Sequence, residues 1–165
     1  MSNSTDIEVI KNSVLAQDLT AEEVERLSQV VKHATLAKDQ LLFREGDSNK
    51  TLYVIISGKI SVGKELNDGE EEWSNLHILK PGDITGEMSF IDGEPASLSL
   101  KAMSNEVELL TLNRDDFEPF IANEPMITFH VMRAILRTSH KIVRRMNSQY
   151  FEMNRFITGQ YTANY

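Results

Sequence analysis

The sequence predicts a mainly β fold with flanking helices: a double-stranded β-helix, or jelly-roll barrel, with short helices before it and one long helix after it. Seven of the eight glycines lie between Gly46 and Gly93, where they separate short β-prone runs. A helix-capping signature precedes this region, and an unbroken apolar heptad pattern follows it. We therefore expect one domain over residues 1–160, with N-terminal helices at 1–36, a β-roll at 37–113, C-terminal helices at 114–160 and a tail at 161–165.

The N-terminal zone, residues 1–36, has the pattern of helices. Thr20-Ala-Glu-Glu23 is a capping box, in which the Thr20 hydroxyl and the Glu23 carboxylate satisfy free amides at the start of a helix. The apolar residues that follow fall at three- and four-residue spacing and give this helix an apolar stripe: Val24, Leu27, Val30 and Val31.

The middle zone holds six short runs of strand-forming residues. These runs are 40–43, 52–57, 59–62, 73–79, 97–102 and 107–112. Turn signals separate them, among them Glu-Gly-Asp at 45–47 and Pro-Gly-Asp at 81–83, because glycine allows the positive φ that a tight reversal needs. Asn-Asp-Gly at 67–69, next to three glutamates at 70–72, predicts an exposed hairpin tip.

The last zone predicts a short helix and then a long one. Asn113 or Asp115 is expected to cap the short helix, which should end near 119–121, and Pro125 should lie in the first turn of the long helix. A heptad seam then runs along the long helix through Phe129, Met132, Leu136, Ser139, Val143, Met146, Tyr150, Met153 and Ile157.

This long helix has two apolar edges. Ile135 and Ile142 form the second edge, so the helix can lie on its own barrel with one edge and on a partner helix with the other. We therefore expect a homodimer through the seam. A single wide face packed on the monomer's own core is the alternative.

Composition narrows the classes of function. The chain has no cysteine, no long apolar run and no signal peptide, which predicts a cytoplasmic protein without disulfides or membrane contact. Its net charge is -8, with 24 acidic and 11 basic residues before Met126, and an acidic body disfavours DNA. No catalytic motif and no His-x-His pair is present, so neither an enzyme nor a metal site is predicted.

Basic residues gather on the long helix, outside the seam: Arg133, Arg137, Lys141, Arg144 and Arg145. A solvated face that pairs with the acidic barrel is the first interpretation. A docking strip for an acidic protein partner, whose identity the sequence does not give, is the second.

The most informative segment is 83–102, which we call the cassette. It has a strand end, a Gly-Glu pair, a short helical turn, a Gly-x-Pro corner and a new strand. Together with Arg44-Glu-Gly-Asp47 and Leu79-Lys-Pro-Gly-Asp83, the run Gly86-Glu-Met-Ser-Phe-Ile-Asp-Gly-Glu-Pro95 resembles the cyclic nucleotide-binding domain family. The resemblance covers about 14–150.

The resemblance implies roles for the cassette residues. Glu87, after Gly86, would accept the ribose hydroxyl, and the amides of Met88 and Ser89 would face the phosphate. The family's phosphate-binding arginine would stand at position 96, where this chain has Ala96. The other expected ligand contacts are the hydroxyls of Ser97 and Ser99, together with Thr138 of the long helix.

Without a cation at position 96, binding of cAMP or cGMP should be weak or lost. We therefore expect a stand-alone regulatory or sensor module with a degenerate cassette that signals through protein contacts, since the chain ends at Tyr165 without a DNA-binding output domain. Lys101 is the nearest base in the sequence, but an ordinary strand lysine is its first interpretation. A ligand-free dimerisation scaffold and a fragment of a transcription regulator are the alternatives.

Overall fold

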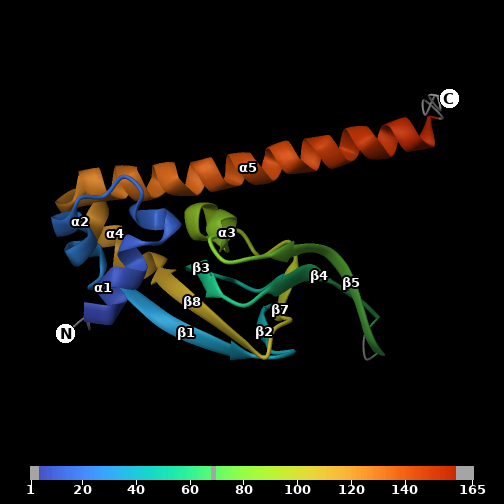
Figure 1. Cartoon of the computed structure of the whole chain (residues 1–165), viewed down its shortest axis with the longest axis horizontal. Helices are drawn as coiled ribbons and strands as arrows, with labels where there is room; N and C mark the ends of the chain where they lie inside the picture. Colours follow the sequence, from blue (N-terminus) through green and yellow to red (C-terminus); the bar gives the residue numbers. More distant parts are fainter. Residues whose placement is uncertain (1–3, 68–69, 159–165) are drawn as a thin grey trace.

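The computed structural model describes residues 4–67 and 70–158. Two four-stranded antiparallel sheets form a β-roll, and helices cover one side of it (Figure 1). The helices are α1 (Ser4–Lys11), the 3-10 helix η1 (Val14–Ala16), α2 (Ala21–Leu27), α3 (Glu87–Asp92), α4 (Arg114–Asn123) and α5 (Pro125–Ile157). This arrangement confirms the predicted fold class.

The first sheet has the strand order β1-β8-β3-β6, and the second has the order β2-β7-β4-β5. The strands of the first sheet are β1 (Val31–Ala37), β8 (Glu106–Asn113), β3 (Thr51–Ser57) and β6 (Ile84–Thr85). Those of the second are β2 (Leu41–Phe43), β7 (Ser99–Ala102), β4 (Ile60–Asn67) and β5 (Glu70–Leu79). Each of the six predicted runs overlaps a strand, although β7 begins only at Ser99 of the run 97–102. The expected hairpin tip lies partly outside the described residues, and the 161–165 tail lies wholly outside them.

One expectation for the N-terminal zone is wrong. Val31 was expected to continue the helical stripe, but α2 ends at Leu27 and Val31 begins strand β1. The reason is long-range: β1 pairs along its whole length with β8, and Val31 lies opposite Leu112. The capping box of α2 is confirmed, since the Glu23 amide donates to the Thr20 hydroxyl at 3.2 Å and the Thr20 amide donates to the Glu23 carboxylate at 2.8 Å.

Two apolar layers hold the molecule together. One lies between the two sheets and includes Ile55, Ile60 and Leu109. The other lies between the first sheet and the helices and includes Leu110 of β8 and Ile135 of α5. Because strand β8 contributes to both layers, the first sheet is the middle layer of the fold.

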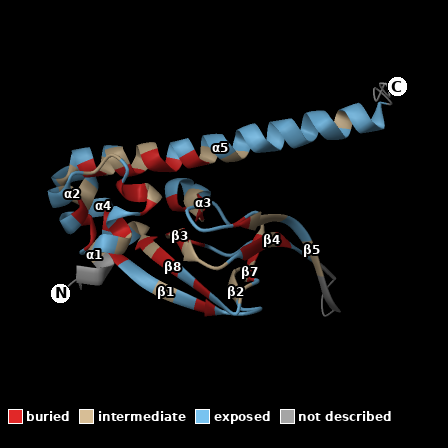
Figure 2. Cartoon of the chain, in the orientation of Figure 1, coloured by how far each residue is buried: buried red, intermediate tan, exposed pale blue. Residues whose placement is uncertain are grey.

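Helix α5 is anchored by its first half only. Its buried residues are Ile127, Val131, Ala134, Ile135 and Thr138, and the helix beyond them is mostly exposed (Figure 2). Asn113 caps α4 by accepting from the Asp115 amide at 2.9 Å, as one of the two expected alternatives, and Pro125 opens α5 as expected. Within the described residues, no helix has the length and apolar character needed to cross a membrane.

Candidate functional site

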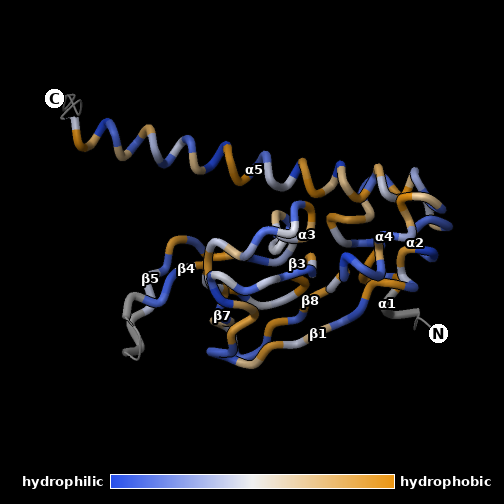
Figure 3. Tube along the Cα trace, turned by 180° about the vertical axis from the view of Figure 1, so that it is seen from behind, coloured by the Kyte–Doolittle hydropathy of each residue, from blue (hydrophilic) through white to orange (hydrophobic). Residues whose placement is uncertain are grey.

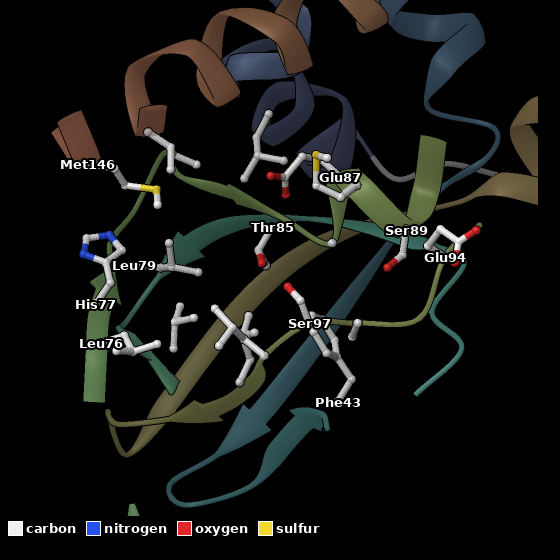
Figure 4. Close-up of a pocket in the computed structure, with 18 of the residues that line it drawn as sticks. Phe43, Leu76, His77, Leu79, Thr85, Glu87, Ser89, Glu94, Ser97 and Met146 are labelled. Carbon is white, nitrogen blue, oxygen red and sulfur yellow. The ribbon is translucent and has the colours of Figure 1, made fainter. Parts of the chain in front are cut away.

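A cavity of about 610 Å³ lies between the β-roll, α3 and α5 (Figure 4). The cassette supplies its lining from β6 and α3 to the corner before β7, and β5 supplies Leu76, His77 and Leu79. Helix α5 closes the cavity with Ile142, Arg145, Met146 and Gln149. These four lie on one face of α5, because their spacing is three, four and seven residues from Ile142.

Gly86 sets the start of α3 and so the position of Glu87. Its φ is +74°, and a Cβ there would lie 2.5 Å from the carbonyl oxygen of Thr51. Both conditions require glycine, since the left-handed backbone disfavours a side chain and the space is already filled. The Gly-Glu pair is therefore fixed by the packing of α3 on strand β3, whether or not a ligand is present.

The corner at Ala96 is held by the loop that follows β2. The Ala96 amide donates to the carbonyl of Asp47 at 2.9 Å, and the Gly46 amide donates to the carbonyl of Ala96 at 2.7 Å. Ala96 is 7% exposed and lines the cavity, so a longer side chain at this position would enter the cavity. Here only a methyl group does.

The structure brings most of the expected ligand residues to the cavity. Six of them line it: Gly86, Glu87, Met88, Ser89, Ala96 and Ser97. Ser99 and Thr138 do not. The Ser99 hydroxyl accepts from the Glu45 amide at 2.9 Å, and the buried Thr138 hydroxyl donates to the carbonyl of Ala134 at 3.1 Å, so both serve the protein's own backbone.

The cassette side of the cavity is acidic. Glu87, Asp92 and Glu94 all line it. Burial raises the pKa of Glu87, which is opposed only by a hydrogen bond from its own backbone amide. Lys101 takes no part, because its ammonium group lies 4.5 Å from the centre of the Trp73 ring in a cation–π contact. A phosphate in the cassette would thus find no neighbouring cation within it.

The one positively charged side chain among the lining residues is Arg145, which sequence reasoning placed on a solvated face. Arg133 and Arg137 of that face bond to Asp18, before α2, so the expected pairing with the barrel is wrong for them. The available signal for Arg145 was its position three residues after Ile142, on the second apolar edge. This spacing predicts that Arg145 lines the cavity only when it is already known that Ile142 faces the cavity.

His77 is the other residue that sequence reasoning did not place here. Its Nε2 atom is buried and has no hydrogen-bond partner among the described residues. Burial lowers the pKa of His77, and the nearby Arg145 charge lowers it further. No group of three or more metal-ligating side chains occurs in the part of the chain that the structure describes.

Comparison with known proteins assigns this architecture. A family model described as "Cyclic nucleotide-binding domain" matches residues 34–124. The chain is 27% identical over 146 residues to a protein of Mycobacterium tuberculosis named "CRP-like cAMP-activated global transcriptional regulator", covering 88% of this chain and 62% of that protein. It is 32% identical over 127 residues to the "Cyclic AMP receptor protein" of Thermus thermophilus, covering 77% and 57%.

A solved structure agrees with these sequence matches. A cyclic nucleotide-binding domain from Methylobacillus flagellatus superimposes with a TM-score of 0.76 at 27% identity, covering 90% of this chain and 83% of that one. The chain spans about three fifths of the length of the two curated relatives. The matches therefore concern the β-roll with its helices rather than the whole of those regulators.

Proposed function

Because this chain belongs to the cyclic nucleotide-binding domain family, whose model matches more than half of it, we propose that it is a regulatory domain with a weakened nucleotide site. In this proposal the cassette binds cAMP or cGMP weakly or not at all. The response of the domain passes to other proteins through contacts made by α5. No catalytic step is part of the proposal.

The observation that carries the proposal is the methyl group of Ala96 at the cassette corner. A cyclic phosphate seated on the amides of α3 would lie beside Ala96 and Ser97, with hydroxyls but no cation from the cassette. Losing one partner of a desolvated charge pair costs about 2–5 kcal/mol, which is roughly thirty- to several-thousand-fold in affinity. The three carboxylates on that side, Glu87, Asp92 and Glu94, add repulsion rather than attraction.

Arg145 does not replace the missing charge in this geometry. Figure 4 shows His77 and Met146 at one end of the cavity and Ser89 and Glu94 at the other. Arg145 precedes Met146 on α5, and its charge acts on His77. It therefore belongs to the end away from the cassette.

The dimer is the second part of the proposal, and its surface is the seam of α5. Most seam residues have more than half of their surface exposed, including Leu136, Val143 and Tyr150. Apolar positions recur along the second half of the helix (Figure 3), and the seam residues there, from Val143 to Ile157, are exposed in the single chain. A heptad spacing of such residues favours a second copy of the same helix as the partner.

The test of the weakened site is calorimetric titration with cAMP and with cGMP. We expect a dissociation constant above the micromolar range for the wild-type chain and a gain of at least about tenfold for Ala96→Arg. Ala96→Leu is the matched control, since it adds length without charge and should give no gain. Sub-micromolar binding by the wild type, or equal behaviour of the two variants, would refute the proposed role of Ala96.

A ligand-free scaffold remains the second candidate, and one observation favours it. The cassette serves the β-roll directly, because Ala96 bonds to the turn at Gly46 and Asp47 and Ser99 bonds to Glu45. A scaffold would keep these residues without any ligand. Partner capture with and without 1 mM cAMP or cGMP separates the two candidates, since a scaffold captures the same proteins in both conditions.

A further inference from the structure

The cavity has its cationic and acidic side chains on different sides. The acidic lining residues Glu87, Asp92 and Glu94 all belong to the cassette, whereas the charge of Arg145, on α5, acts on His77 of β5. Figure 4 shows His77 at one end of the cavity and Glu94 at the other. A bound anion would therefore be attracted to the end away from Ala96. This distribution of charge disfavours a phosphate group on the cassette. It favours a ligand whose anionic group lies near Arg145 and whose uncharged part lies toward the cassette.

Arg145 is free to meet such an anion. It forms no hydrogen bond or ion pair with any residue within 4–67 and 70–158, whereas Arg133 and Arg137, on the same helix, both bond to Asp18. Its guanidinium presents several N–H donors in a planar arrangement that matches a carboxylate, sulfonate or phosphate. Arg145 is also the one lining residue that carries a positive charge at neutral pH.

His77 adds a polar atom that lacks a partner. Its Nε2 is buried, and no described residue hydrogen-bonds to it. A buried nitrogen of this kind is normally satisfied by protein, water or ligand. Because Nε2 is buried in this structure, the His77 ring would have to turn toward the cavity when the anion binds. An anionic oxygen beside Arg145 would then accept a hydrogen bond from the ring, once the ring carries its proton on Nε2.

The rest of the cavity lining is mainly apolar. Side chains of β4, β5, β6, β7 and α5 contribute to it: Val62, Leu76, Leu79, Ile84, Leu100, Ile142 and Met146. The total volume of about 610 Å³ lies within the range of cavities that hold drug-sized molecules. The occupant therefore needs an apolar body as well as a charge.

We propose that this cavity binds an organic anion with an apolar body, with its charged group between Arg145 and His77 and its body over Leu76, Leu79 and Ile142. The inference rests on the proposed regulatory function, because it names the ligand class of the same site. It also links the ligand to α5. Arg145 lies beside Met146, which lines the cavity and belongs to the seam.

Binding of the anion should take up a proton. Burial and the Arg145 charge lower the pKa of His77, with Lys80 acting in the same direction and Asp83 in the opposite one. An anion at Nε2 favours the protonated ring and offsets the Arg145 charge. Affinity should therefore rise as the pH falls from 8 to 6.

The test compares two fluorescent probes on the 165-residue chain. The anionic probe is 8-anilinonaphthalene-1-sulfonate, and the neutral one is N-phenyl-1-naphthylamine, which keeps the aromatic body without the sulfonate. We expect Arg145→Gln to weaken binding of the anionic probe by about ten- to a hundredfold and to leave the neutral probe within about twofold. Arg144→Gln is the matched control, because it removes the same charge from the neighbouring position, which does not line the cavity.

Two further variants complete the test. Ile142→Trp fills the cavity and should lower the affinity for both probes. Unchanged affinity for both probes would show that they bind to the exposed seam instead, and this would overturn the proposal. His77→Gln should remove the gain in anionic-probe affinity between pH 8 and pH 6. Equal losses in Arg145→Gln and Arg144→Gln, or a loss of the neutral probe in Arg145→Gln, would also overturn it.

The outcome is separable from that of the proposed function. Tight binding of cAMP by the wild type would refute the weakened cassette, and the contrast between the two probes would still measure the Arg145 end. A missing contrast between the probes would refute the anion site, while the gain expected from Ala96→Arg would still stand or fall on its own.

Discussion

The proposed dimer makes the most direct prediction, and Leu136→Gln is the perturbation that tests it. Leu136 is the third residue of the seam on α5 and is 65% exposed in the single chain. Glutamine keeps a similar size and a high helix propensity, so α5 itself should be unaffected. The substitution removes only the apolar contact that a second copy would make.

The expected magnitude follows from the exposed fraction. Full burial of a leucine side chain is worth about 1.5–3 kcal/mol, so the part of Leu136 that is still exposed could contribute about 1–2 kcal/mol in each copy. A twofold interface contains the residue twice, which gives about 2–4 kcal/mol for the dimer. The dimer dissociation constant should therefore rise by about thirty- to nearly a thousandfold.

Sedimentation velocity over a concentration series measures that constant directly. Ile121→Gln is the control, since Ile121 is 57% exposed on α4 and lies outside the seam. The control should dissociate like the wild type. A wild-type chain that stays monomeric at about 100 μM, or equal effects of the two variants, would show that the seam is not the interface.

Two predictions concern the stability of the cavity wall. Glu87→Gln should raise the melting temperature at pH 8 by about 2–4 °C, which corresponds to about 1 kcal/mol, because burial raises the pKa of Glu87 and so penalises its charged form. The gain should vanish near pH 4, where the carboxyl group is largely protonated in both the folded and the unfolded chain. An equal gain at both pH values would contradict this cause. Gly86→Ala should lower the free energy of unfolding in urea by about 2 kcal/mol or more, and Gly82→Ala, with a similar φ of +89° but open space, by only about 1 kcal/mol. Equal losses would show that contact with Thr51 adds nothing.

The elements that sequence reasoning predicted correctly are those with local signals. The capping box at Thr20 and the N-cap at Asn113 depend on residues two or three positions away. Most of the predicted strand runs are bounded by glycine turns that need no distant partner, such as the turn at Gly58 between the runs 52–57 and 59–62. Strand β1 was missed because its conformation depends on pairing with β8, more than sixty residues later. Its helix-like start at Val30 and Val31 gave the opposite local signal.

The candidate site also divides into residues with local sequence signals, which could be predicted, and residues that only the fold brings together. The cassette could be predicted as a set because Gly86, Glu87 and Ala96 are close in sequence and one short helix holds them together. Arg145 and His77 come from elements almost seventy residues apart in the sequence, and only the fold brings both of them to the wall of the cavity. Thr138 shows the converse, because it lies on the same face of α5 as Ile142 but one turn before the residues that line the cavity, where its hydroxyl donates to the carbonyl of Ala134.

Helix α5 connects the proposed ligand site with the proposed dimer seam, because the same half of the helix contributes residues to both. Met146 lines the cavity, and it also belongs to the seam together with Val143 and Tyr150. A ligand that fixes Arg145 against His77 therefore restricts where the free half of α5 can lie, and a second copy packed on the seam restricts the same movement. Coupling between two such sites is reciprocal, because each ligand can shift the helix only by its differential affinity for the two positions. In the proposed function, a regulatory signal would then run from cavity to seam without any change inside the β-roll, because the apolar layer between the first sheet and the helices holds only the first half of α5.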